Sequence, residues 1–245
     1  VDREVWRLAN SKWQKISTVE LPGKGCTAYS ATAVSDIVYF GVTNCGLRVY
    51  QYDKSGFSQT KLGLGDDVLA QYGDVYELHN WNDRLIIGAT ARFGTAGLYA
   101  YRPDGGISKI GGDGVNGSWI NAGFTFPESL STHRGNLIAT FERTPMVHSP
   151  ITAVWSFDGT NWAPLGTKKM PSMWFKMMNF NASNSINGTL LVAGGGLPNG
   201  FASIWHMDSE GIFHQLGGHG IAESWGAKDG VISPTSAAEY IYRIE

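Results

Sequence analysis

Alternating apolar and polar residues, interrupted by polar turns, run along most of this chain of 245 residues. The clearest stretch is 128–166, in which four short runs are separated by turns such as Asp158-Gly159. Alternation with a period of two is typical of strands that bury one face. The stretch is therefore predicted to form a four-stranded antiparallel meander. Its expected strands are 128–133, 136–141, 152–157 and 162–166.

The third strand of this unit contains an aliphatic residue followed by an aromatic one, and the same kind of pair occurs in four other places. Successive aromatic members are 44, 49, 56 and 50 positions apart, and the interval from the last one through the chain end back to the first is 46. A repeat whose last interval is completed by joining the two ends is what a ring of units requires. The five pairs are Val5-Trp6, Val49-Tyr50, Leu98-Tyr99, Val154-Trp155 and Ile204-Trp205.

The sequence thus predicts an all-β fold, a five-bladed β-propeller of four-stranded antiparallel blades, closed by two N-terminal and two C-terminal strands in one shared blade. The two C-terminal strands are expected at 232–237 and 240–242. They would complete the pair of strands that the N-terminus supplies, and such closure removes free sheet edges. We expect a single domain, 1–245, whose approximate blades are 26–63, 72–111, 120–166, 175–217 and the shared blade 1–18 with 226–245.

Composition agrees with a β-rich protein and argues against two classes of partner. The chain has 32 Gly, which supply turns, and 9 Trp, 10 Tyr and 11 Phe, which supply a core. Lys and Arg number 19 against 21 Asp and Glu, without a basic run that could neutralise phosphates, so no nucleic-acid partner is expected. No apolar stretch approaches the roughly 18 residues of a membrane span, so no membrane insertion is expected.

The two cysteines, Cys26 and Cys45, flank the predicted turn Ser35-Asp36 at equal distances. In a regular hairpin they would lie directly opposite each other, and the Cα atoms of a non-hydrogen-bonded pair are about 4.5 Å apart. This distance is compatible with a disulfide. We therefore predict a disulfide, and with it a protein that is secreted or displayed on the extracellular surface. The alternative is two buried free thiols, because a bulge or a shift of one residue would separate them.

The segments between consecutive blades carry a second repeat, in which a polar position is followed seven residues later by an aromatic one. An aromatic ring beside Asp, Asn or His can stack on the apolar face of a sugar while the polar groups bind its hydroxyls. The alternative is that these rings fill the gaps between neighbouring blades. The candidate ligand-binding residues are Asp66, Asp67, Tyr72, Asp113, Asn116, Trp119, Trp174, His219, Glu223 and Trp225.

Signals for catalysis and for bound metals or cofactors are weak. The histidines show no HExxH or paired spacing, and we expect neither a metal nor a cofactor. Turn carboxylates such as Asp158, followed by Gly159, are interpreted as turn formers. The acid pair that we would test for glycoside hydrolysis is Glu77 with Glu128, on the first strands of consecutive blades. An enzyme is therefore not the favoured interpretation.

With the repeat established, the chain resembles the five-bladed lectin propellers of the tachylectin type and the bacterial repeat propellers whose blades contain Gly-Gly-Asp-Gly followed by Trp, as at 111–114 and Trp119. The segment 156–162 is similar to the structural Asp-box turn of other propellers. The resemblance implies multivalent binding of glycans or a glycosylated surface, without catalysis, at shallow sites between blades. The alternatives are a glycoside hydrolase and a structural or protein-interaction propeller that uses the loop 142–150.

Overall fold

In the computed structural model, described residues are 5–16, 26–44, 46–62, 73–91, 96–104, 106–120, 124–143, 152–166, 178–196 and 201–218. Their regular structure is all strand apart from one short 3-10 helix, η1 (Val115–Gly117). No helix in these ranges has the length and apolarity to cross a membrane. The all-β prediction is therefore confirmed.

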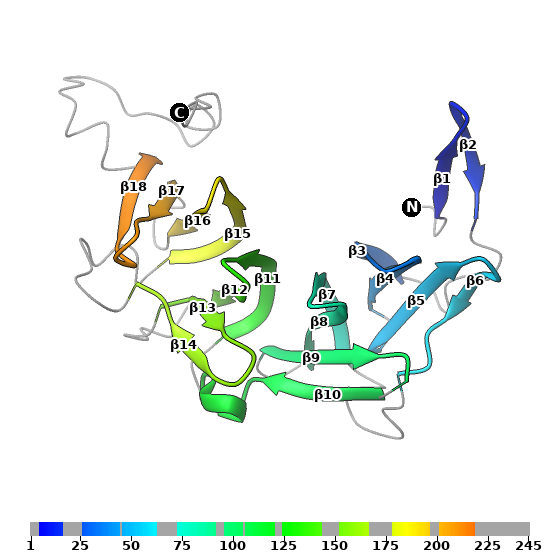
Figure 1. The fold of residues 1–245 in the computed structure, drawn as a ribbon, viewed down its shortest axis with the longest axis horizontal. Coiled ribbons are helices and arrows are strands. Elements are labelled where there is room, and N and C mark those ends of the chain that lie inside the picture. Colours follow the sequence, from blue (N-terminus) through cyan, green and yellow to red (C-terminus); the bar gives the residue numbers. More distant parts are fainter. Residues whose placement is uncertain are drawn as a thin grey trace. The chain divides into compact units, whose positions relative to one another are not determined.

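Four meanders of four strands account for most of the described residues (Figure 1). In each meander consecutive strands are neighbours, which confirms the predicted four-stranded antiparallel units. The sheets are, in chain order, β3 (Thr27–Val34), β4 (Ile37–Thr43), β5 (Arg48–Asp53) and β6 (Gly56–Gln59); β7 (Gly73–Trp81), β8 (Arg84–Ala91), β9 (Ala96–Arg102) and β10 (Gly106–Gly111); β11 (Phe124–His133), β12 (Asn136–Arg143), β13 (Val154–Phe157) and β14 (Trp162–Pro164); β15 (Met178–Ile186), β16 (Thr189–Gly196), β17 (Phe201–Met207) and β18 (Phe213–Gly218). We refer to β3, β7, β11 and β15 as the first strands.

A fifth, two-stranded sheet pairs β1 (Trp6–Ala9) with β2 (Lys12–Lys15). On one face Arg7 donates to Gln14 and to the hydroxyl of Tyr52 on β5, at 3.0 Å each. The other face, with Trp6, Leu8 and Trp13, is exposed. The strands predicted to complete this blade, 232–237 and 240–242, lie outside the described residues, and the described part contains four four-stranded sheets and one two-stranded sheet.

Contacts between residues divide the chain into two compact units. The first unit contains residues 1–121 with 125–130, and the second contains 122–124 with 131–245. In the first unit, the sheets β3–β6 and β7–β10 share a core to which Tyr39, Val49, Leu78, Ile87 and Tyr99 contribute. Aliphatic and aromatic residues at alternate positions of these strands thus build the core that holds two first strands against each other.

The close approach of sheets within the first unit depends on glycines in the second strands. A methyl group at Gly41 would come within 2.5 Å of Cγ1 of Val75, and one at Gly88 within 2.7 Å of Cγ of Pro127. Larger residues would therefore push the next first strand away. This crowding is the reason why small residues suit these positions.

In the second unit, small polar residues join two first strands. The hydroxyls of Ser131 and Ser183 lie 2.8 Å apart, and Nδ1 of His133 lies 2.9 Å from the Ser185 hydroxyl. His133 is buried, and burial lowers the pKa of its imidazole. The small polar side chains of these strands thus form hydrogen bonds between neighbouring sheets.

The hairpin that carries Cys26 departs from the regular register on which the disulfide prediction depended. Tyr29 is an extra residue in β3, because Ala28 pairs with Val42 while Ser30 pairs with Gly41. Thr27 therefore lies opposite Thr43, so this end of the ladder is shifted by one residue from the regular register on which direct opposition of the cysteines was predicted. Cys26 is buried and no cysteine in the described ranges is free. Cys45 lies outside those ranges, so the disulfide itself stays a prediction.

Candidate functional site

Three of the ten residues predicted at the junctions between sheets are described: Asp113, Asn116 and Trp119, all in the segment between β10 and β11. This segment folds around η1, where Asp113 and Asn116 have positive φ angles of 55° each. Asp and Asn tolerate the left-handed region better than most residues, which explains their presence here. The other seven predicted ligand contacts lie outside the described residues; they are Asp66, Asp67, Tyr72, Trp174, His219, Glu223 and Trp225.

Trp119 is an internal residue of this segment and not a surface platform. Its side chain is 1% exposed, and its Nε1 donates to the carbonyl of Ala96 at 3.0 Å. A ring with no exposed face is unable to stack on a sugar in this conformation. The structure therefore agrees, at this junction, with the alternative that the aromatic residue fills the interior.

The polar side chains of the same segment are exposed but already have partners in the protein. Asp113 forms an ion pair with Lys109, and Nδ2 of Asn116 donates to the carbonyl of Ile110 at 3.1 Å. Both interactions stabilise the loop conformation. Asp113 and Asn116 thus offer a small polar surface, while the aromatic residue of the same segment, Trp119, is buried.

The turn carboxylates have the structural role that the sequence indicated. Oδ1 of Asp158 accepts from the backbone N–H groups of Thr160 and Asn161 at 2.7 and 2.8 Å. Oδ1 of Asp208 accepts from Glu210 and Ile212 at 2.9 Å each. The backbone hydrogen bonds favour the ionised form of Asp158 and lower its pKa, whereas the pKa of Asp208 is lowered first by a hydrogen bond with His214 and then by those from the backbone. Such groups close turns and are poorly suited to donate protons.

A different site emerges on the first strands, where β-bulges occur at equivalent positions. Tyr29 in β3 and Tyr76 in β7 are both extra residues in their ladders, and each stands six residues before the turn that ends its strand. The same offset places Glu128 in β11 and Asn181 in β15, and Asn181 is also an extra residue. Bulges redirect a side chain and are common beside functional sites. The four positions thus carry Tyr, Tyr, Glu and Asn.

Three aromatic rings of the first unit form a continuous row across three first strands. Tyr29 meets Tyr76 edge to face, with ring centroids 5.6 Å apart, and Tyr76 stacks on Phe126 at 4.3 Å. Tyr29 is 58% exposed, so the row reaches the surface at this end. We call Tyr29, Tyr76 and Phe126 the aromatic row.

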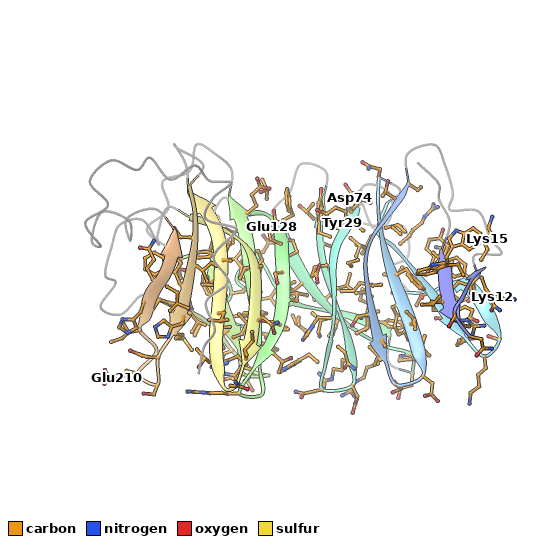
Figure 2. All side chains as sticks on the ribbon, turned by 90° about the horizontal axis from the view of Figure 1, so that it is seen from above. Lys12, Lys15, Tyr29, Asp74, Glu128 and Glu210 are labelled. Carbon is orange, nitrogen blue, oxygen red and sulfur yellow. The ribbon has the colours of Figure 1, made fainter. Side chains whose placement is uncertain are left out.

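Carboxyl groups accompany the aromatic row on β7 and β11. Glu77 follows Tyr76 directly; burial and the charge of Glu128 raise the pKa of its carboxyl to about 7. Burial also lowers the pKa of His79 on the same strand. Figure 2 shows Tyr29, Asp74 and Glu128 toward the same end of their strands. Asp74 accepts a hydrogen bond from the backbone N–H of Asn44, in the neighbouring sheet.

The structure thus brings together one pair that sequence reasoning had considered, Glu77 with Glu128, and adds residues that it had missed. Tyr29, Tyr76 and Phe126 are not among the candidates that the sequence singled out. The equal offset of the two tyrosines from their turns was the available signal. No group of His, Cys, Asp and Glu suited to hold a metal ion occurs in the described ranges.

The chain matches no protein-family model and no curated protein sequence. Similar solved structures include a protein from Lactobacillus plantarum, with 16% identity and a TM-score of 0.57, over 88% of this chain and 63% of that one. YCF48 bound to D1 peptide is 12% identical, with a TM-score of 0.50 and coverage of 87% and 64%. Dipeptidyl peptidase 4 of Porphyromonas gingivalis is 12% identical, with a TM-score of 0.51 and coverage of 88% and 36%.

These likenesses define a class of fold. The chain has an all-β fold of four-stranded antiparallel sheets, similar to solved structures of the propeller type. It spans less than two thirds of the length of each of the three structures named above. At such identities the similarity concerns the fold and does not extend to activity.

Proposed function

We propose that the protein is a non-catalytic, lectin-like carbohydrate-recognition module, built on a five-bladed β-propeller that N-terminal and C-terminal strands close in a shared blade. The two-stranded sheet β1–β2 supports closure, since two further strands that pair along its edge would give it the four strands of the other sheets. The proposal includes secretion or surface display, in keeping with the predicted link between Cys26 and Cys45.

The observation that carries the binding proposal is the aromatic row with its exposed end at Tyr29. An exposed tyrosine held in place by ring contacts offers a rigid apolar face, on which the C–H face of a sugar ring can stack. The carboxyl groups of Glu77 and Glu128 can accept hydrogen bonds from sugar hydroxyls beside it. We therefore place the principal contact here. Asp113 and Asn116 stay in the proposal as a secondary polar contact.

A glycan array followed by calorimetric titration of the hits tests this proposal. Tyr29→Ala should weaken binding about tenfold, since one stacked ring contributes about 1 kcal/mol beyond its buried area. Tyr29→Phe should retain most of the affinity. Ile186→Ala, which shortens another exposed apolar side chain, serves as the control and should leave binding unchanged. An array without hits, or hits that Tyr29→Ala binds normally, would refute the proposed site.

Glycoside hydrolysis is the second candidate, and the pairing of Glu77 with Glu128 favours it. A carboxyl group with a pKa near 7 beside a second carboxyl group is an arrangement that can supply a general acid and its partner. Release of reducing ends from array hits would show turnover, and both Glu77→Gln and Glu128→Gln should abolish it. Binding without turnover would retain the recognition module and exclude this alternative.

A further inference from the structure

The aromatic row and the two glutamates form a site with two chemically different ends. At one end, Tyr29 is exposed and meets Tyr76 edge to face. At the other, Tyr76 stacks on Phe126, and Glu77 and Glu128 lie on the same two strands, β7 and β11. A ligand that follows the row therefore passes from an apolar surface to a pair of carboxyl groups.

The chemistry of the acid end disfavours further negative charge. Glu77 is influenced by burial and by the negative charge of Glu128, and both disfavour its anion. The negative charge of Glu128 favours a positively charged group, because an ammonium would donate hydrogen bonds to the carboxyl groups and be attracted to that charge. The aromatic rings add independently to the preference of the site for a cation, because the negative face of a ring attracts a cation within about 6 Å.

The residues at the equivalent position of each first strand also differ in type. In a multivalent lectin with equivalent sites, the same residue type would be repeated at each first strand. Here the positions carry Tyr29, Tyr76, Glu128 and Asn181, which are not interchangeable in size or charge. The two tyrosines and the glutamate are better suited to different parts of one ligand than to copies of it.

We propose that this site binds one saccharide per chain, a saccharide that carries a protonated amino group, with its ring on the aromatic row and its ammonium at Glu77 and Glu128. The inference rests on the proposed function and names the ligand class of that same site. Uronic and other acidic sugars are disfavoured by the carboxyl pair. A neutral saccharide fits the aromatic end but lacks a group for the acid end.

Calorimetric titration of the full chain with three matched oligosaccharides tests the inference: a glucosamine tetramer, its N-acetylated form and a glucose tetramer, at a pH where the amine is protonated. The glucosamine tetramer should bind at least about tenfold more tightly than the other two, which corresponds to about 1.4 kcal/mol, with a stoichiometry of one. Acetylation removes the charge and leaves the ring, so it isolates the contribution of the ammonium.

Two variants locate the effect. Glu128→Gln should abolish the preference for the amine while binding of the glucose tetramer is retained, whereas Tyr29→Ala should weaken all three ligands. Glu210→Gln, the same substitution in the exposed turn between β17 and β18, should change nothing. Thermal unfolding of each variant verifies the fold, and Glu77→Gln replaces Glu128→Gln if the latter does not fold.

The outcomes separate the inference from the function on which it rests. Equal affinity for amino, acetylated and neutral tetramers, or a stoichiometry above one, overturns the inference and retains carbohydrate recognition. A preference for the amine that persists in both glutamate variants overturns it as well. Absence of binding to any saccharide on the array removes the proposed function itself.

Discussion

Tyr76 and Phe126 stack across two sheets, with ring centroids 4.3 Å apart and planes only 7° from parallel. Tyr76 is the bulge residue of β7, while Phe126 belongs to β11. This contact joins two first strands at the place where the glutamates lie. It also supports Tyr29, whose edge-to-face contact with Tyr76 fixes the exposed end of the row.

The first prediction concerns this stack. Phe126→Leu removes the ring contact while an apolar side chain remains, and it should lower the free energy of unfolding by about 1 to 2 kcal/mol. Chemical denaturation measures the change. Tyr29→Phe, which keeps its ring, should stay within about 0.5 kcal/mol of the parent protein. A cost for Phe126→Leu no larger than that of Tyr29→Phe would show that the stack is not a stabilising contact.

The second prediction concerns the pH dependence of stability. The pKa of Glu77 is raised to about 7 in the folded protein from an ordinary value of 4.5, so the folded state holds a proton that the unfolded state releases between these pH values. The contribution of this bound proton to the stability of the folded state is complete below pH 4.5 and is lost as the pH rises through 7. Glu77→Gln should therefore be more stable than the parent at pH 8, by up to about 3 kcal/mol, and similar to it at pH 4.

Chemical denaturation of the Glu77→Gln protein and its parent at pH 4, 6 and 8 checks this pH dependence. The effects of other titrating groups cancel in the difference between the two free energies of unfolding. Glu210→Gln is the matched control and should show no pH-dependent difference. A constant difference across the three pH values would contradict the raised pKa.

The third prediction tests the close approach of neighbouring sheets. Gly41→Ala places a methyl group within 2.5 Å of Val75 and should cost about 1 to 3 kcal/mol of unfolding free energy. Val75→Ala in the same chain removes the obstructing methyl and should recover part of this cost. A double-mutant cycle measures the coupling, and strictly additive effects would mean that the two residues do not meet.

The fourth prediction concerns the cysteines. If Cys26 and Cys45 are linked, the unreduced protein unfolded in denaturant should react with no thiol reagent, and the reduced protein should expose two thiols. Reduction should also lower the free energy of unfolding by about 2 to 4 kcal/mol. Two reactive thiols before reduction would exclude the link and remove its support for an extracellular location.

The fifth prediction concerns closure of the shared blade. If strands at 232–237 and 240–242 complete the blade by pairing beside β1, the backbone amides of β1 should be protected from hydrogen exchange in the full chain and should lose this protection when residues 226–245 are deleted. The amides of β2, which pairs with β1 on its other side, provide the control. Equal exchange of the β1 amides in the two chains would contradict the shared blade.

Alternation with period two and turns at regular spacing were sufficient to predict the four meanders. A strand with one buried face has apolar residues at alternate positions, and this pattern is visible within the strand's own sequence. The predicted runs at 128–133 and 152–157 overlap β11 and β13 closely. Turn carboxylates such as Asp158 were also recognisable, since their hydrogen bonds reach only two or three residues along the chain.

What the sequence by itself determined, then, is the repeat, its strands and its turns, together with the Glu77 and Glu128 pair as a candidate. Only the tertiary structure decided that Trp119 is internal, that the hairpin of Cys26 shifts by one residue, and that Tyr29, Tyr76 and Phe126 form a row. The physical reason is that a bulge changes which way a side chain points without changing the composition around it. Contacts between residues about 50 positions apart depend on how sheets pack, which local periodicity does not encode.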